Sequence, residues 1–257
     1  MGVVNVTPDS FSDGGLYLDP GAAIGHGEEL ARDGAAILDV GGESTRPGAE
    51  EVSAEEELGR VEPVIEGLVG SGAVVSVDTS KAAVAEAALE AGAEIVNDVT
   101  ALRHDPEIAR LCAERGAGLI LMHMQGTPRT MQENPVYDDV VDDVKAFLAE
   151  RMEVAASAGV AEGRIWLDPG IGFGKTLEHN LELLRRLGEL RSLGQPLVVG
   201  TSRKSFIGKV DGSKPDDRLG GTIASTVLAV AEGADIIRVH DVAEARQAMR
   251  VATAILG

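Results

Sequence analysis

The stretch LVVGTSRKSF (197–206) runs from an apolar strand pattern directly into polar and cationic residues. The same pattern, a short apolar run with a polar ending, occurs eight times along the chain. Apolar runs of this length between turn residues are typical of buried β-strands. The other seven runs are GVVNV (2–6), AILDVGG (36–42), VVSVD (74–78), EIVND (94–98), GLILMH (118–123), IWLD (165–168) and IIRVH (236–240).

Helix-like segments separate these runs, so the sequence repeats a strand-then-helix unit. Eight such units are the signature of an α/β fold, the (β/α)₈ TIM barrel, whose active site lies at the carboxyl ends of the strands. The helices are expected at about 20–34, 53–70, 80–91, 105–115, 137–159, 178–190, 219–233 and 242–256. The fold nominates these polar strand-end residues: Asn5, Asp39, Asp78, Asn97, Asp98, His123, Asp168, Lys204, Arg238 and His240.

The length and composition fit this fold. We expect residues 1–257 to form one domain, because barrels commonly reach this size as a single unit. No Ser/Pro-rich linker or block of charge divides the sequence. Aromatic residues make up only 3% of the chain, so small aliphatic residues must fill its core. Such residues suit the layered interior of a barrel.

The net charge of −19 argues against nucleic acids and anionic membranes as partners, because their phosphates attract clustered Lys and Arg. Acidic residues on outer helix faces account for most of this charge. Four basic residues nevertheless lie close together near two strand ends: Arg203, Lys204, Arg238 and His240. Cations concentrated on an acidic body indicate a local anion-binding site.

Cys112 is the only cysteine, which excludes an intramolecular disulfide. It sits in the helical pattern PEIARLCAERG (106–116), where we expect a buried and inert thiol. The sequence shows no signal-peptide pattern and no apolar run near the roughly 20 residues that span a bilayer. A cytoplasmic location is therefore expected.

Three expected strand-to-helix connections are too long for simple turns: 7–19, 41–52 and 124–136. Long loops in compact domains are commonly functional lids or disordered segments. We expect at least the first two to close over a ligand. The second contains GGESTRPG (41–48), in which Arg46 either extends into solvent or reaches over the site.

The strand-end cations predict an anion clamp. Arg238 lies within an apolar run, where an arginine is costly unless it meets an anion or a carboxylate. Strand alternation places Arg238 and His240 on the same side, and Lys204 follows the preceding strand. Barrels often bind phosphate at the last two strands. A merely solvated Lys204 is the alternative.

Asp78, Asn97 and Asp168 each end a different apolar run. A single buried carboxylate commonly pairs with a neighbouring cation, but three polar ends that converge on a barrel mouth favour a ligand. Together they offer donors and acceptors suited to a flat, nitrogen-rich heterocycle. No His/Cys spacing resembles a zinc site.

Asn5 ends the first run in NVTPDSFSDGG (5–15), where it either caps a turn or provides an oxygen ligand for Mg²⁺ on a phosphate. The residues alone favour the turn cap. His123 is either a general base or polar lining. DPGIGFGKT (168–176) lacks the GxxxxGK[ST] spacing of a nucleotide loop.

Taken together, these segments resemble the dihydropteroate synthase family, in order and over essentially all 257 residues. Two of the segments, NVTPDSFSDGG (5–15) and the one that contains SRKSF (202–206), are long enough to be specific to this family. The resemblance rests on NVTPDSFSDGG (5–15), DVGGESTRPG (39–48), SVDTSK (76–81), NDV (97–99), LMHMQGTPRTMQ (121–132), LDPGIGFGKT (167–176), GTSRKSF (200–206) and RVHDV (238–242).

The resemblance implies a transferase of folate biosynthesis. This family joins 6-hydroxymethyl-7,8-dihydropterin diphosphate to p-aminobenzoate and releases pyrophosphate and dihydropteroate. It implies a dissociative, SN1-like displacement that uses Mg²⁺, and sulfonamides as competitors of p-aminobenzoate. A homodimer through outer helices is also implied.

The resemblance also implies roles for individual residues. Lys204, Asp78, Asp168, Arg238 and His240 would be catalytic. The residues that bind the pterin would be Asp78, Asn97, Asp168 and Lys204, with Met122, Phe173 and Gly200 around the ring. Asn5 would bind the metal, and Arg238 and His240 would contact the diphosphate. The pocket for p-aminobenzoate would consist of Thr45, Arg46, Pro47, Phe173, Lys204 and Ser205.

Two other classes remain at this point. A related pterin-binding methyltransferase would share the pterin pocket but have no use for the STRPG loop or the Lys204–Ser205 pair. A paralogue that binds pterin without turnover is the third interpretation. Family members usually carry a short segment before the first strand, whereas this chain starts in it. We expect that difference to concern the barrel floor rather than the catalytic face.

Overall fold

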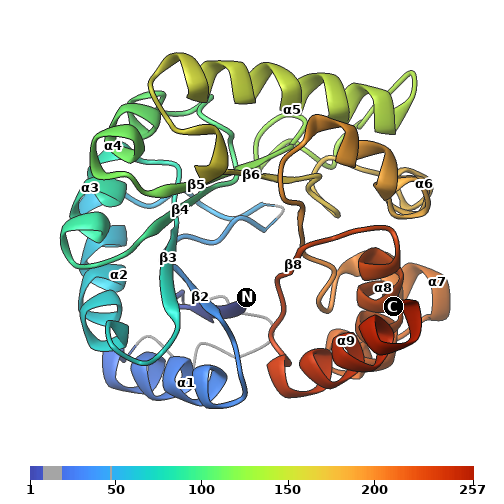
Figure 1. Cartoon of the computed structure of the whole chain (residues 1–257), viewed down its shortest axis with the longest axis horizontal. Coiled ribbons are helices and arrows are strands. Elements are labelled where there is room, and N and C mark those ends of the chain that lie inside the picture. The colour runs from blue at the N-terminus through green and yellow to red at the C-terminus, as the bar shows by residue number, and fades with distance from the viewer. Residues whose placement is uncertain (8–18, 47) are drawn as a thin grey trace.

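The computed structural model describes residues 1–7, 19–46 and 48–257. It contains parallel strands near the centre with helices outside them (Figure 1). The strands are β1 (Gly2–Asn5), β2 (Ile37–Gly41), β3 (Val74–Asp78), β4 (Ile95–Asp98), β5 (Gly118–Met122), β6 (Ile165–Asp168), β7 (Val198–Val199) and β8 (Ile236–Ile237). The helices are α1 (Pro20–Arg32), α2 (Ala54–Leu68), α3 (Ala82–Glu90), α4 (Glu107–Arg115), α5 (Val140–Ser157), α6 (Leu177–Arg185), α7 (Ser205–Asp211), α8 (Leu219–Ala231) and α9 (Val242–Leu256).

The strands close into a ring. β1 to β6 pair in sequence order, and β7 pairs with β8. Single bridges from Leu167 to Leu197 and from Gly2 to Val239 join these two groups at both edges. The prediction of a (β/α)₈ barrel is thereby confirmed. The register sets Asn5 beside Gly41, Gly41 beside Asp78 and Asp78 beside Asn97 at the carboxyl ends.

An aliphatic layer lies directly beneath these carboxyl ends. Ile37, Ile95, Ile120 and Val198 form a buried cluster that is separate from the main core. Each lies two residues before Asp39, Asn97, Met122 or Gly200, and side chains two apart share a face of a strand. The cluster therefore forms an apolar floor inside the barrel, below the polar ring.

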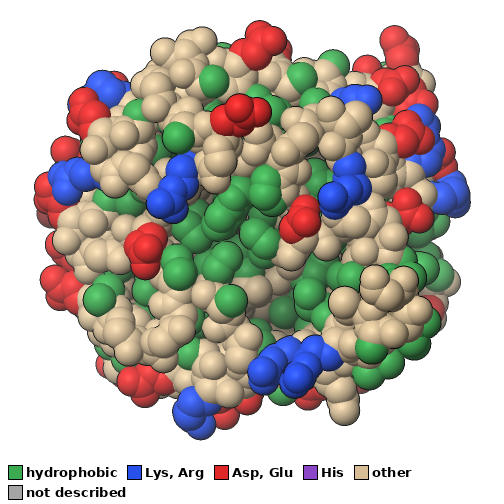
Figure 2. All heavy atoms as spheres, viewed as in Figure 1, with side chains coloured by type: hydrophobic (Ala, Val, Ile, Leu, Met, Phe, Trp, Pro, Cys, Tyr) green, Lys and Arg blue, Asp and Glu red, His purple; other side chains and the backbone are tan. Residues whose placement is uncertain are grey.

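Acidic and hydrophobic side chains occupy different parts of the visible face of the molecule. Figure 2 shows Asp and Glu side chains mostly toward the edge of the visible face, with hydrophobic side chains near its centre. In the described ranges, no helix is long and apolar enough to cross a membrane.

Cys112 is fully buried, and burial raises the pKa of its thiol to about 12, as expected for an inert cysteine.

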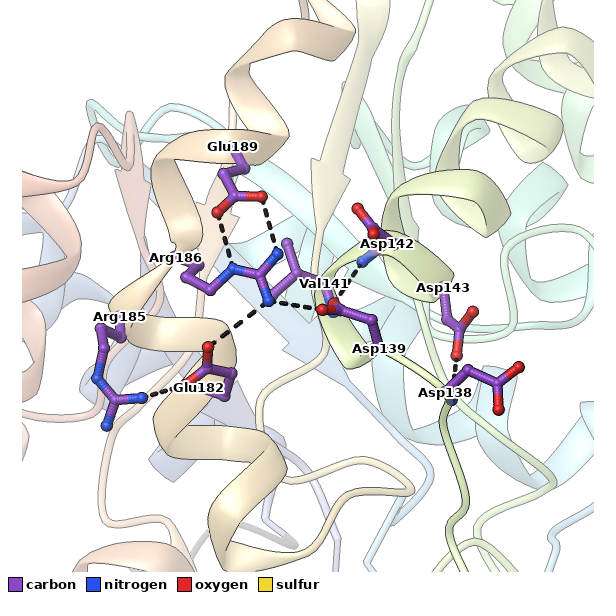
Figure 3. Close-up of polar contacts among 9 residues, drawn as sticks. All are labelled: Asp138, Asp139, Val141, Asp142, Asp143, Glu182, Arg185, Arg186 and Glu189. Carbon is purple, nitrogen blue, oxygen red and sulfur yellow. Dashed lines mark hydrogen bonds and ion pairs between the residues drawn. The ribbon is translucent and has the colours of Figure 1, made fainter.

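A polar network ties α5 to α6 on the outside of the barrel (Figure 3). Asp139 caps α5 by accepting from the backbone N–H groups of Val141 and Asp142 at 2.9 and 3.1 Å. Arg186, just after α6, donates to Asp139 at 2.7 Å and to Glu189 at 2.7 Å. The start of one helix is thus fixed to the end of the next.

The structure also departs from the expected element bounds. The short helix α7 begins at Ser205, directly after Lys204, and was not predicted, because its seven residues SFIGKVD are too few for a periodic signal. β7 and β8 are two residues each, shorter than their apolar runs. In both, the chain leaves the sheet where the site residues begin.

Candidate active site

One cavity at the carboxyl ends of the strands collects most of the nominated residues. Its walls come from loops and strand ends on all sides of the barrel. Among its lining residues are Thr45, Asp78, Asn97, Met122, Asp168, Phe173, Gly200, Lys204, Arg238 and His240, all of them predicted from the sequence. Ser202 also lines it and was not predicted.

The strand-end residues Asp39, Asp98 and His123 do not line this cavity. Asp98 instead accepts from the backbone N–H groups of Thr100 and Leu102 at 2.8 and 2.6 Å.

Four of the residues to which the resemblance assigns a role are also not among the lining. Asn5 ends β1, Arg46 lies in the connection after β2, and Ser205 opens α7. Pro47 lies outside the described residues, as does the central part, 8–18, of the connection 7–19. The expectation that the loops 7–19 and 41–52 close over a ligand stays a prediction.

Arg238 is the centre of a buried ion-pair network. Its Nε donates to Asp39 Oδ2 at 2.6 Å, and its Nη2 donates to Asp78 Oδ2 at 2.9 Å. Asp39 is fully buried and also accepts from Ser76 Oγ at 2.7 Å and from Asn97 Nδ2 at 3.0 Å. Asp39 thereby orients both Arg238 and Asn97. The Nη1 atom of Arg238 makes neither of these two contacts and is available to an anion.

The two strand-end acids of the cavity have raised pKa values. Burial raises the pKa of Asp78, while the charge of Arg238 opposes the rise. Burial also raises the pKa of Asp168, which accepts from the backbone N–H of Gly170 at 2.7 Å. Buried carboxyls with such shifts are typical of functional sites, although structural ion pairs also produce them.

Lys204 enters the cavity above an aromatic ring. Its Nζ lies 4.1 Å from the centroid of Phe173, a cation–π distance. Burial lowers the pKa of this lysine to about 8.

The side chain of Arg203 points away from the cavity. Its backbone φ is 54°, and its Nε donates to Asp241 at 3.0 Å. The expected cluster of four cationic residues therefore loses Arg203, because that guanidinium pairs outside the cavity.

His240 contributes to the site as a neutral imidazole. Burial lowers its pKa to about 3, so it carries no charge near neutral pH. Ser202 Oγ accepts from the backbone N–H of His240 at 3.2 Å and lies 2.9 Å from its Nδ1. In the tautomer in which this hydroxyl donates to Nδ1, the imidazole proton lies on Nε2. An anion would meet an N–H donor here rather than a cation.

The segment 168–176 forms one wall by tight folding against β5. A Cβ on Gly170 would lie 1.9 Å from the carbonyl oxygen of His123, and the φ of Gly170 is 68°. Lys175 is buried inside this wall and contacts Gly170 O, Phe173 O and His123 Nδ1 at 2.9, 3.0 and 2.9 Å. His123 is thus a structural partner of Lys175, not part of the cavity lining. No sequence signal indicated that Lys175 is buried in this way.

The donor set near Asn5 fits a weakly held hard cation. Among the described residues, no group of three or more His, Cys, Asp or Glu side chains could hold a metal ion. A Cβ on Gly41 would lie 3.8 Å from Asp78 Oδ2 and 3.9 Å from Asn5 Oδ1, so these oxygens share the space above Gly41. Mg²⁺ commonly uses one or two protein oxygens together with substrate phosphates and waters.

Comparisons with known proteins show the family of the chain. The model of the family described as pterin binding enzyme matches residues 1–240. The dihydropteroate synthase of Escherichia coli K12 is 50% identical over 257 residues, covering 100% of this chain and 91% of that protein.

Solved structures extend the similarity to three dimensions. A Yersinia pestis dihydropteroate synthase with a sulfonamide drug complex is 47% identical, with a TM-score of 0.96 over 99% of this chain and 93% of that one. A Xanthomonas albilineans dihydropteroate synthase with 4-aminobenzoic acid is 48% identical, with a TM-score of 0.92 over 99% and 92%.

The fold and cavity define a barrel enzyme of the pterin-binding class. The chain therefore belongs to the pterin binding enzyme family and, within it, to the dihydropteroate synthases. The methyltransferase alternative is wrong, because relatives that are dihydropteroate synthases match over 100% and 99% of this chain.

Proposed function

We propose that this chain condenses 6-hydroxymethyl-7,8-dihydropterin diphosphate with p-aminobenzoate to give 7,8-dihydropteroate and pyrophosphate. The observation that carries the proposal is the single cavity that joins Asp78, Asn97, Asp168 and Lys204 to Arg238 and His240. The E. coli relative carries the name of this activity, and the X. albilineans relative binds one of the two substrates.

The pterin would occupy the deep part of the cavity. Asp168 and Asn97 offer acceptors and donors at the edge of a flat, nitrogen-rich ring. Met122 lines the same cavity, and Phe173 lies under Lys204. Gly200 leaves space for the ring, because a Cβ at this position would lie 3.8 Å from the Cβ of Arg238 and would narrow the cavity. The apolar floor below excludes water.

The diphosphate would face Arg238 and His240. Arg238 offers Nη1 while its other nitrogens remain on Asp39 and Asp78, and His240 offers Nε2–H. Asn5 would hold Mg²⁺ through its side-chain oxygen, together with phosphate oxygens of the substrate. That ion, when bound, neutralises charge that develops on the leaving pyrophosphate.

The chemistry breaks a C–O bond before it makes a C–N bond. The bonding electrons go to the pyrophosphate oxygen, where Arg238 stabilises the new charge. The carbon left behind is a cation conjugated to the pterin, which Asp78 and Asp168 favour electrostatically in their ionised forms. The amine of p-aminobenzoate then donates its lone pair to this carbon, and the proton that it loses passes to the released pyrophosphate. No activated nucleophile of the protein is needed.

The p-aminobenzoate would bind at the outer rim. Thr45 and Phe173 line the cavity on this side, and Arg46, Pro47 and Ser205 are proposed to complete the pocket. Lys204 would lie between both substrates. Exclusion of water at this stage protects the carbocation from hydrolysis.

A direct test follows the product. Purified protein with dihydropterin diphosphate, Mg²⁺ and p-aminobenzoate should form 7,8-dihydropteroate, measured by liquid chromatography. A sulfonamide should raise the apparent KM for p-aminobenzoate without lowering kcat. Pterin binding without any dihydropteroate would instead favour the paralogue without turnover.

We propose a homodimer through α8 and α9. Leu228 on α8 and Val251, Ile255 and Leu256 on α9 are exposed by 62, 55, 78 and 58%. Figure 2 shows hydrophobic side chains toward the lower right, where Figure 1 places these two helices. An exposed apolar face of this kind is typical of an interface. Ile255→Glu should convert a dimer to a monomer in light scattering; an unchanged mass would contradict this interface.

A further inference from the structure

A buried ion-pair cluster outside the cavity connects α2, α3 and the connection 42–53. Lys81, the residue before α3, donates from Nζ to Glu57 Oε2 at 2.6 Å and to Glu43 Oε2 at 2.7 Å. The side chains of Lys81, Glu57 and Glu43 are 11, 0 and 17% exposed. We refer to these three residues as the Lys81 cluster.

The Lys81 cluster holds both ends of the connection that carries Thr45. Glu43 Oε1 accepts from the backbone N–H of Val52 at 3.0 Å, so one side chain bridges the start and the end of the segment. Arg60 of α2 donates to the carbonyl of Gly42 at 2.7 Å. Gly42 itself is packed so closely that a Cβ would lie 2.7 Å from Val61. Thr45 follows Glu43 by two residues and lines the cavity.

The charges of the cluster do not balance. Two carboxylates share one ammonium, and Glu57 Oε1 is buried without a hydrogen bond to any described residue. Although burial lowers the pKa of Lys81, its hydrogen bonds to Glu43 and Glu57 raise the pKa above its ordinary value. Buried ion pairs add little net stability compared with apolar residues of similar volume, so a role in fixing geometry is the better account.

We propose that Lys81 and Glu43 are positioning residues for p-aminobenzoate: by joining α2 to both ends of the segment 43–52, they fix Thr45 at the cavity rim. This role rests on the proposed function for its substrate, but the mechanical link does not. Positioning groups act by placing a reactant correctly, and small displacements cost large factors in rate or affinity.

Hydrogen exchange tests the mechanical link without any substrate. In Glu43→Ala, the Val52 amide loses its acceptor, and its exchange should become about tenfold faster or more. Lys81→Met should accelerate the same amide, since Glu43 then loses its anchor. Glu51→Ala is the matched control, because Glu51 is exposed in the same segment. Exchange in Glu43→Ala equal to that of the control would overturn the proposal.

Steady-state kinetics tests the consequence for the substrates. In Glu43→Ala, the KM for p-aminobenzoate should rise about tenfold, while the KM for the pterin diphosphate should change less than about twofold. Glu51→Ala should leave both constants near those of the unaltered enzyme. An equal rise of both KM values would show a general structural defect and refute the positioning role.

The two tests separate the two proposals. If the unaltered enzyme makes no dihydropteroate, the proposed function fails, and the exchange of Val52 still decides whether the cluster holds the segment. Lys81→Met leaves Glu57 buried without its partner and thus risks unfolding. Glu43→Ala keeps the Lys81–Glu57 pair and remains the decisive variant.

Discussion

The two halves of the candidate site differ in how their residues are held. In the strand-end half, Asp39, Asp78, Asn97 and Arg238 are joined by hydrogen bonds across the barrel mouth. In the loop half, Thr45 stands on a connection that is fixed at its base by the Lys81 cluster. The first half is built into the sheet; the second is attached to it.

This difference matches the order of the proposed chemistry. A strand-end half with fixed dipoles and charges can stabilise the departing pyrophosphate without reorganising, which is the main source of electrostatic catalysis. A separate loop half can bind the second substrate beside the carbon that the pyrophosphate leaves. Changes in the strand-end half should therefore affect turnover with both substrates, whereas changes in the loop half should affect p-aminobenzoate alone.

Arg238→Ala should give the largest effect. It removes the leaving-group contact and leaves Asp39 and Asp78 without their cation, so kcat/KM for the pterin diphosphate should fall about 10²–10³-fold. The free energy of unfolding should fall by about 3–5 kcal/mol, because a buried pair loses one partner. Both are measurable by kinetics and urea denaturation. An effect on p-aminobenzoate binding alone would break the division into halves.

Lys204 is proposed to lie between the two substrates, so its substitution tests where the two halves of the site meet. Lys204→Ala should weaken pterin binding and abolish measurable turnover; a near-normal kcat/KM would refute its role. Because the pKa of Lys204 is lowered to about 8, its ammonium is lost as pH rises through that value. The pH profile of kcat/KM should then fall on the alkaline side near pH 8. Lys204→Arg keeps the charge at high pH and should remove that limb.

Thr45→Val probes the loop half with a change of similar volume. Loss of one hydroxyl contact should raise the KM for p-aminobenzoate about fivefold, corresponding to roughly 1 kcal/mol. The KM for the pterin diphosphate should stay the same. Initial rates at varied concentrations of each substrate provide the comparison. A matching rise for both substrates would show that the halves are not separate.

His123 gives the smallest effect, on stability rather than turnover. Burial lowers its pKa from 6.5 to about 2, so below pH 6.5 His123 binds a proton in the unfolded chain but not in the folded chain. Stability is therefore fully present above pH 6.5 and is lost as pH falls toward 2. In urea melts between pH 7.5 and 5.5, His123→Asn should lose less stability than the unaltered chain.

The strand-end half was predictable from the sequence because periodicity and position determine it. Alternation in IIRVH sets Arg238 and His240 on one side, and parallel strands bring Asp78, Asn97 and Asp168 to one mouth. Asp39 was nominated only by its position. Its bond to Arg238 joins residues 199 positions apart, which no local pattern reveals.

Other features required the fold itself. Lys175 looked like part of a failed nucleotide loop, and only the turn at Gly170 shows that it is buried among carbonyl groups. The neutral state of His240 depends on burial that its sequence context does not encode. Arg203 and Lys204 are adjacent in sequence, yet the left-handed backbone at Arg203 sends their side chains to different places.

Pyrophosphate release, measured with and without p-aminobenzoate, decides whether the two halves of the site act in one reaction. Release should depend on p-aminobenzoate and equal the dihydropteroate formed, because both halves must be filled before the reaction is completed. Absence of release despite measurable binding of the pterin diphosphate would contradict the claim that this chain is a working synthase.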